Sequence, residues 1–327
     1  MSLLILKKTT RVARYQPVEC KSFLHHFDKK FLPFNWGADP YRGCEHSCPY
    51  CFARYTHEYL GYNSGKEFDN RILVKVNAAE VLEKELSRPR WKRAVVNLGS
   101  VCDPYQPADK KFKITRQVLK VFAKHRNPLF IGTKSNLVLR DIDVLSEMAK
   151  HTTLIVYFTI TTLDGNVRRK IEPRAASTEE RLNAVKQLSD AGVTVGILFM
   201  PIFPYLTDDF ENINGVVKAV SDCGAKDIIS GVLNLRASCR NRILTFIKEE
   251  FPDLLPKYLT LYKNVYAPKD YTGKIYRAVE TARRRCGLKK FEMPIPKEKQ
   301  TKLQSLSKRV GNQKSVDFRH YVLNSFL

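Results

Sequence analysis

The sequence predicts an α/β protein whose parallel strands form a full or partial TIM-like barrel. Between Tyr41 and about Arg236, short apolar runs alternate with longer stretches of helical periodicity. Strands separated by helices of about 10–15 residues indicate βαβ units and a parallel sheet. A doubly wound open sheet is the alternative. No G-x-G-x-x-G follows the first strand and no G-x-x-x-x-G-K-[ST] occurs, which disfavours nucleotide-binding sheets of those two kinds.

The expected strands and helices follow one another in regular order. Six strand-like runs lie at residues 72–76, 94–98, 129–133, 154–161, 193–200 and 227–235. A capping-box-like start, Asn77 to Glu80, opens a helix that reaches about Leu86. Further helices are expected at residues 115–125, 141–151, 178–191 and 208–222, the third of them capped by Ser177 with Glu180. Six such units predict a partial TIM-like (β/α)6 barrel with its chemistry at the C-terminal ends of the strands.

The flanking segments differ from this core in composition. Residues 1–36 show no clear period and are expected to form an N-terminal extension of the core barrel, which covers residues 37–239. Residues 240–288 predict a helical extension with helices at about 240–250, 254–264 and 274–286. Beyond Gly287, lysine, glutamine and serine increase, and residues 289–327 are expected to be a basic tail that is partly helical near its end.

A loop at residues 43–51 carries three cysteines in the spacing C-x3-C-x2-C, just before a helix-like segment at residues 52–60. Cys44, Cys48 and Cys51 on one short loop can reach three corners of a [4Fe–4S] cluster and leave the fourth iron open. A structural zinc site is the alternative, with His46 or His57 as fourth ligand. The other five cysteines form no second close-spaced group, so no auxiliary cluster is expected.

The formal net charge is +23, and residues 240–327 carry more than half of it in little over a quarter of the chain. Such a balance favours a polyanionic partner, DNA or RNA, because a lysine or arginine that neutralises a phosphate releases counterions. We expect the run Arg283-Arg284-Arg285 and the lysines of the tail to contact phosphates. The alternative is charge that serves general solubility.

Membrane and export signals are not expected. No run reaches the roughly 18 apolar residues of a membrane span, and the apolar run at residues 3–6 is broken at once by Lys7 and Lys8. Scattered cysteines indicate a reducing compartment. The sequence therefore predicts a cytoplasmic protein without membrane association.

The cysteine loop, with the aromatic Tyr50 directly before the last cysteine, resembles the radical S-adenosylmethionine (SAM) superfamily. With further motifs, the chain resembles the group of that superfamily related to spore photoproduct lyase, often labelled DNA repair photolyase-like. The matching motifs lie at residues 35–54, 56–61, 99–107, 133–135 with 138–141, 161–164 and 172–175. The likeness spans about residues 35–288 and does not cover the first thirty residues or the tail.

This resemblance implies a radical SAM barrel and two cofactors, a [4Fe–4S] cluster and S-adenosylmethionine. In that superfamily the amino and carboxylate groups of S-adenosylmethionine chelate the fourth iron, and one-electron reduction releases methionine and a 5′-deoxyadenosyl radical. The electron comes from a donor such as flavodoxin or ferredoxin. Tyr50, beside the cluster loop, is expected to contact the cofactor.

The resemblance also assigns site residues at the ends of the expected strands. Lys134 follows the third strand and is expected to pair with the cofactor carboxylate, unless it is a solvated lysine at a strand end. Asp103, in the loop after the second strand, or the carbonyls of Gly99 to Val101, would accept hydrogen bonds from the cofactor ammonium. A turn-capping aspartate before Pro104 is the structural alternative for Asp103.

Further candidates lie on and after the fourth strand. Alternation sends Tyr157, Thr159 and Thr161 to one face, so the two threonines either contact the ribose or amino-acid part of the cofactor or pack inside the barrel. Arg174, in the loop that follows, suits a carboxylate or a phosphate. The resemblance to spore photoproduct lyase makes Cys102 the candidate hydrogen-atom donor to the product radical. Its offset in the loop differs from the family's, and Ser100 is the alternative for that place.

Two classes of function follow. The first is a radical SAM enzyme that abstracts a hydrogen atom from nucleic acid, in lyase-type repair of a DNA lesion, or from RNA or protein in a modification reaction. The second is a nucleic-acid-binding protein with a structural or redox-sensing cluster. Asp103, Lys134 and Arg174 favour the enzyme, because a structural cluster needs none of them and more often has a fourth protein ligand.

Overall fold

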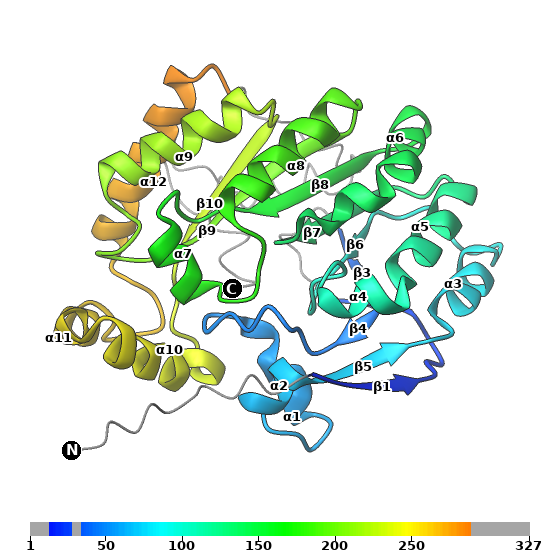
Figure 1. The fold of residues 1–327 in the computed structure, drawn as a ribbon, viewed down its shortest axis with the longest axis horizontal. Helices are drawn as coiled ribbons and strands as arrows, with labels where there is room; N and C mark the ends of the chain where they lie inside the picture. The colour runs from blue at the N-terminus through cyan, green and yellow to red at the C-terminus, as the bar shows by residue number, and fades with distance from the viewer. Residues whose placement is uncertain (1–12, 28–33, 289–327) are drawn as a thin grey trace, which may run out of the picture.

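A computed structural model of the chain describes residues 13–27 and 34–288 (Figure 1). Its main sheet contains six parallel strands in chain order, followed at one edge by the short antiparallel strand β2 (Leu24–His26). The six strands are β3 (Trp36–Ala38), β6 (Val96–Leu98), β7 (Leu129–Thr133), β8 (Leu154–Thr159), β9 (Thr194–Ile202) and β10 (Asp227–Val232). Because β10 and β2 are the edges of the sheet, the strands form a partial barrel. The expected α/β fold with a partial (β/α)6 barrel is therefore confirmed.

Helices cover the outer face of this curved sheet (Figure 1). The larger ones between successive strands are α3 (Ala78–Leu86), α5 (Ile114–Lys124), α6 (Ile142–His151), α8 (Thr178–Asp190) and α9 (Phe210–Asp222). After β10 come α10 (Ala237–Glu250), η3 (Pro252–Leu254), α11 (Leu255–Leu261) and α12 (Lys269–Arg285). Because α12 packs against α9 and β10, it occupies the place of the sixth barrel helix.

The alternation along β8 separates two apolar clusters. Val156 and Phe158 pack in the large cluster between the sheet and its helices, whereas Ile155 and Tyr157 belong to a smaller cluster with Phe130. The predicted division of this strand into two faces is therefore confirmed. Each large apolar side chain buried in this way contributes about 1.5–3 kcal/mol to folding.

A separate three-stranded sheet lies beside the barrel, with strand order β1 (Arg14–Val18), β5 (Arg71–Lys75) and β4 (Tyr41–Arg42). The strand predicted at residues 72–76 exists as β5, but it pairs with β1 and β4 and not with the barrel strands. The first barrel strand is instead β3, only three residues long. A strand this short shows no alternation, and its pairing with β6 is a long-range contact that no local pattern reports.

The two predicted helix N-caps, at Ser177 and at Asn77, differ in the structure. Ser177 and Glu180 form the predicted capping box of α8, in which each side chain accepts the other residue's backbone N–H. Asn77 occupies the N-cap position of α3, which spans Ala78–Leu86 as predicted, but its side chain makes no capping hydrogen bond. Its side chain accepts the Cys20 N–H at 2.9 Å and donates to the Cys20 carbonyl at 3.1 Å, which ties the segment after β1 to the start of α3.

In the basic run at the end of α12, Arg283 is buried, whereas Arg284 and Arg285 are exposed. Arg283 is only 6% exposed and contacts Glu280, which also pairs with Arg284 at 3.0 Å. The Arg285 guanidinium lies 6.0 Å from the centre of the Phe210 ring. The expectation of phosphate contacts is therefore wrong for Arg283, and the tail at residues 289–327 lies outside the described residues.

Small helices connect the remaining parts: η1 (Phe52–Arg54), α1 (Tyr55–Glu58), α2 (Lys66–Asn70), α4 (Pro107–Phe112), η2 (Asn136–Asp141) and α7 (Gly165–Ile171). Across the described residues, no helix is both long and apolar enough to span a membrane.

A buried charge network joins α4, α5 and η2. Arg140 contacts Asp109 at 2.6 Å and Asp141 at 2.8 Å, and both carboxylates are completely buried. Arg116 on α5 also reaches Asp141, at 2.9 Å, and the Tyr41 hydroxyl donates to Asp109. The carboxylates thus fix the loop after β6 against the loop after β7.

Replacing Arg140 by Met is expected to lower the free energy of unfolding by about 3 kcal/mol, because two buried carboxylates lose a cation. Denaturant unfolding followed by circular dichroism measures this change. The control is Lys186→Met, since Lys186 pairs with Asp190 on the surface of α8, where both side chains are more than half exposed. That exposed pair is worth at most about 1 kcal/mol. Equal losses in the two variants would contradict a special role for Arg140.

Candidate active site

The cysteine loop begins directly after β4 and turns sharply at Gly43, which has a φ of +83°. A side chain at Gly43 would lie 2.9 Å from the carbonyl oxygens of Phe68 and Arg71, so only glycine fits. The Cys44 N–H donates to the same Phe68 carbonyl at 3.0 Å. These contacts hold the start of the loop against the end of α2 and the start of β5.

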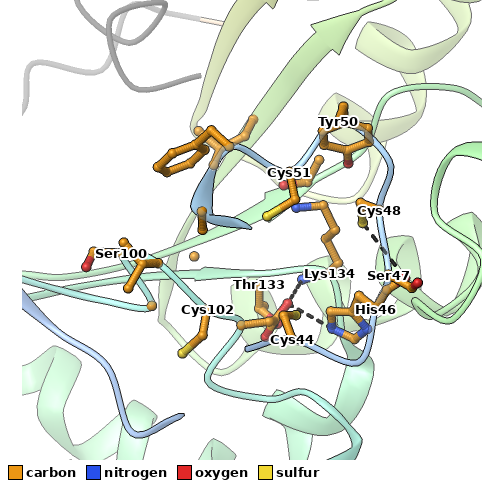
Figure 2. Close-up of a pocket in the computed structure, with 18 of the residues that line it drawn as sticks. Cys44, His46, Ser47, Cys48, Tyr50, Cys51, Ser100, Cys102, Thr133 and Lys134 are labelled. Carbon is orange, nitrogen blue, oxygen red and sulfur yellow. Dashed lines mark hydrogen bonds and ion pairs between the residues drawn. The ribbon is translucent and has the colours of Figure 1, made fainter. Parts of the chain in front are cut away.

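The three cysteines face one cavity of about 160 Å³ (Figure 2). The cavity lies where the barrel strands end, as predicted, and residues on or just after β6, β7, β8 and β9 complete its wall. These residues are Gly99, Ser100, Val101, Cys102, Asp103, Gly132, Thr133, Lys134, Thr159, Leu198 and Met200. Figure 2 shows the Lys134 side chain rising between Cys51 and Cys48, with Cys44 on the opposite side.

The donor set of this cavity suits an iron–sulfur cluster. All three thiols are free of disulfides, and Cys44 and Cys48 are almost completely buried. Burial raises the pKa of Cys48 to about 12 and that of Cys44 well above its ordinary value, so these thiols hold their protons until a metal replaces them. Gly132 leaves room in the wall next to the cysteines, because a Cβ there would meet only one atom, at 4.0 Å.

Asp103, in the cavity wall, is buried and surrounded by hydrogen-bond donors. Its carboxylate accepts the N–H groups of Tyr105 at 2.9 Å and Lys134 at 2.7 Å, and the Thr133 hydroxyl at 2.8 Å. Nε2 of His46 lies 3.0 Å away. Burial by itself would raise the pKa of Asp103, but His46 and these donors lower it to about 2. The hydrogen bond to the Tyr105 N–H matches the turn-capping alternative, and Asp103 lines the cavity together with residues 99–101.

The Lys134 side chain enters the cavity without a carboxylate at ion-pair distance in the described part of the chain. Its ammonium lies 5.7 Å from the centre of the Tyr50 ring. Burial opposes its charge, but the neighbouring acidic groups of Cys48, Glu172 and Asp103 raise its pKa. Lys134 is therefore a protonated cation that is available to an anionic group in the cavity.

Behind the cavity, two residues that sequence reasoning missed form a buried ion pair. The Tyr50 hydroxyl donates to Glu172, and Nη1 of Arg181 lies 2.6 Å from the other oxygen of Glu172. Burial by itself would raise the pKa of Glu172, but Arg181 and Lys134 lower it. Arg181 also donates to the carbonyls of Thr159 at 2.8 Å and Ala176 at 2.7 Å. Glu172 belongs to the motif at residues 172–175, whereas no local sequence pattern identifies Arg181.

Arg174 does not enter the cavity. Its side chain is exposed and donates to the Asn70 amide oxygen at 3.3 Å. The Arg174 backbone carries the contact with the cysteine loop instead: its carbonyl lies 3.2 Å from Nδ1 of His46, and its N–H donates to the His46 carbonyl at 3.4 Å.

The two threonine candidates separate in the structure. Thr159 lines the cavity at the end of β8. Thr161 is buried two residues further on and does not line it, and its hydroxyl oxygen has no hydrogen-bond partner among the described residues. Of the two, Thr159 is the one placed to touch a ligand in this cavity.

Cys102 also lines the cavity, next to a second buried carboxylate. Asp39, just after β3, accepts the Ser100 hydroxyl at 2.6 Å and the Val101 N–H at 2.8 Å, and lies 3.5 Å from the Cys102 sulfur. Burial first, and then the charge of Asp39, raise the pKa of Cys102 well above its ordinary value. The thiol therefore keeps its hydrogen.

Comparisons with known proteins agree with this geometry. The Radical SAM superfamily profile matches residues 39–214. An uncharacterized protein of Mycobacterium tuberculosis is 32% identical over 88% of this chain and 86% of its own length. An uncharacterized protein of Methanocaldococcus jannaschii is 33% identical over 65% and 75%.

Among solved structures, the chain resembles a spore photoproduct lyase mutant with bound AdoMet and dinucleoside spore photoproduct. The TM-score is 0.62 at 14% identity, over 83% of this chain and 79% of that one. This likeness confirms the fold. The profile match over more than half of the residues shows that the chain belongs to the radical SAM superfamily, whose enzymes use a [4Fe–4S] cluster and S-adenosylmethionine.

Proposed function

We propose that this radical SAM enzyme abstracts a hydrogen atom from a nucleic-acid substrate, with lyase-type repair of a DNA lesion as the specific reaction. The observation that carries the radical chemistry is the cavity that three free cysteines share with a cation, with open space beside Gly132 near the end of β7. A net charge of +23 and the fold shared with spore photoproduct lyase support the nucleic-acid substrate.

In this proposal Cys44, Cys48 and Cys51 hold the cluster, and Lys134 pairs with the carboxylate of S-adenosylmethionine. When bound, the two cofactors supply one-electron reductive cleavage of a carbon–sulfur bond, with the electron from a donor of the flavodoxin or ferredoxin class in the reducing cytoplasm. Tyr50, held by Glu172, and Thr159 form the adjoining walls. Arg174 has no part, because its guanidinium points away from the cavity.

Cys102 is the proposed hydrogen-atom donor to the product. Its S–H bond would break homolytically, the hydrogen atom would pass to the product radical, and the sulfur radical left behind would take an electron and a proton from the electron donor and solvent. The retained thiol and its place in the cavity wall support this role.

The test of the function is the amount of 5′-deoxyadenosine formed by anaerobically reconstituted enzyme with candidate substrates. We expect dinucleoside spore photoproduct, lesion-bearing DNA or RNA to raise this amount above the level without substrate. The proposal is contradicted, in favour of protein modification, if no nucleic acid raises the rate of 5′-deoxyadenosine formation and a protein does.

Replacing any one of Cys44, Cys48 and Cys51 by Ala is expected to abolish the visible thiolate-to-iron absorbance and most bound iron, because three thiolates are the protein's whole contribution to the cluster. Iron analysis after anaerobic reconstitution measures the loss. Cys223→Ala, at the end of α9 and outside the cavity, is the control and should retain full iron. Full loading of the triple variant would contradict the assignment.

Replacing Lys134 by Ala is expected to weaken S-adenosylmethionine binding about ten-fold or more, since one charge-assisted contact is worth about 1.5–3 kcal/mol. Equilibrium dialysis of the cluster-loaded protein measures this affinity. Arg174→Ala removes the same charge from an exposed position and should change the affinity less than about two-fold. The assignment of Lys134 does not survive if the Lys134 variant binds the cofactor as tightly as the unmodified protein does.

Replacing Cys102 by Ala is expected to leave reductive cofactor cleavage intact while the product no longer gains deuterium from heavy water. Mass spectrometry of the product, for a substrate that stimulates 5′-deoxyadenosine formation, measures the incorporation. Cys239→Ala, a buried cysteine outside the cavity, is the control. Unchanged deuterium content in the Cys102 variant would transfer the role to another residue, with Ser100 as the nearest candidate.

A further inference from the structure

A second, larger cavity adjoins the cysteine cavity and is not explained by the cofactors. Its volume is about 640 Å³, within the range of roughly 300–1,000 Å³ typical of ligand sites. Phe52, Ser100 and Val101 line both cavities, so the two meet beside Cys51 and Cys102. The rest of the wall is Ser22, Phe23, Leu24, His25, Phe27, Asp39, Arg42, Tyr55, Thr56, Tyr59, Lys75 and Arg236.

Cations outnumber acids in this wall. Arg42, Lys75 and Arg236 stand against one carboxylate, Asp39, which is 1% exposed and already engaged by Ser100 and Val101. By contrast, Arg54 and Arg242 each have an ion-pair partner, the carboxylate of Asp69, which they share. In the described residues, the ion pairs include neither Arg42 nor Lys75, so the cavity carries an unbalanced positive charge that suits phosphate.

Aromatic rings line the same cavity. Tyr59 is 80% exposed and stands one helical turn after Tyr55, with the two ring centres 5.7 Å apart at 86°. Phe23, Phe27 and Phe52 add apolar surface. Aromatic rings beside unbalanced cations are the combination that binds unpaired nucleotides, because bases stack on the rings while phosphates contact the cations.

We propose that this cavity binds one unpaired nucleotide of the substrate, with its phosphates at Arg42 and Lys75 and its base against Tyr55 and Tyr59. The junction at Phe52, Ser100 and Val101 then presents the nucleotide to the cofactor cavity. This inference rests on the proposed nucleic-acid function and names the part of the protein that would recognise the substrate.

Fluorescence anisotropy with the full chain tests the inference, with a labelled single-stranded DNA, an RNA of the same length and a DNA duplex over a range of salt concentrations. The variant Arg42→Gln with Lys75→Gln should bind single strands more weakly and reduce the log–log salt slope by about 1.4, since each phosphate contact contributes about 0.7. Tyr59→Ala should lower affinity about ten-fold with an unchanged slope. The DNA and RNA arms show which backbone is preferred.

Matched controls separate these effects from general charge and hydrophobicity. Lys92→Gln with Lys120→Gln removes the same charge from exposed positions outside the cavity, and Tyr266→Ala removes another exposed ring. Iron loading and S-adenosylmethionine affinity check that every variant is folded. Tyr59→Ala keeps the test decisive if the double variant does not fold, because the Tyr59 ring is mostly solvated.

The outcomes distinguish this inference from the proposed function. If the unmodified protein binds nucleic acid and the cavity variants bind as the controls do, the cavity is not the nucleotide site, while the nucleic-acid function stands. If the unmodified protein binds no nucleic acid, both fail. Stronger binding of duplex than of single strands, unaffected by Tyr59→Ala, would also overturn the unpaired-nucleotide site.

Discussion

The mouth of the barrel depends on the buried carboxylate of Asp103. It joins three segments that are distant in sequence: His46 from the cysteine loop, Tyr105 after β6, and Thr133 with Lys134 at the end of β7. A buried charge is costly unless it is paired and hydrogen-bonded. The Asp103 carboxylate and its hydrogen-bond donors therefore hold one another in position. Glu172 acts in the same way on the other side of the cavity, between Tyr50 and Arg181.

These carboxylates determine which groups remain for chemistry. Asp103 and Glu172 are occupied by protein donors, whereas the Lys134 ammonium enters the cavity with only the Tyr50 ring and neighbouring acidic groups around it. Asp39 likewise orders residues 100–102, so that backbone and thiol face the cavity in a fixed arrangement. Such preorganisation suits a reaction in which a reactive species must be held close to one hydrogen atom and away from water.

The side-chain positions change the interpretation of where positive charge is available to a partner. The arginine run at residues 283–285 resembles a nucleic-acid surface in the sequence, but Arg283 is buried against Glu280, and only Arg284 and Arg285 are exposed. Arg42 and Lys75, from β4 and β5, bring further positive charge to the second cavity. Net charge alone therefore indicates a polyanionic partner and not where it binds.

The sequence by itself determined the local features: the cysteine loop, the alternation of strands and helices, the capping box at Ser177, and Lys134 directly after Thr133 at a strand end. These follow from spacing and periodicity, which depend on neighbouring residues. Only the tertiary structure decided that β3 begins the barrel while β5 pairs elsewhere, that Arg174 points outward, and that Arg181 neutralises Glu172. It also decided that a second cavity meets the first. Each of these depends on contacts between residues far apart in the chain, whose energies are set by burial and pairing that a local pattern does not contain.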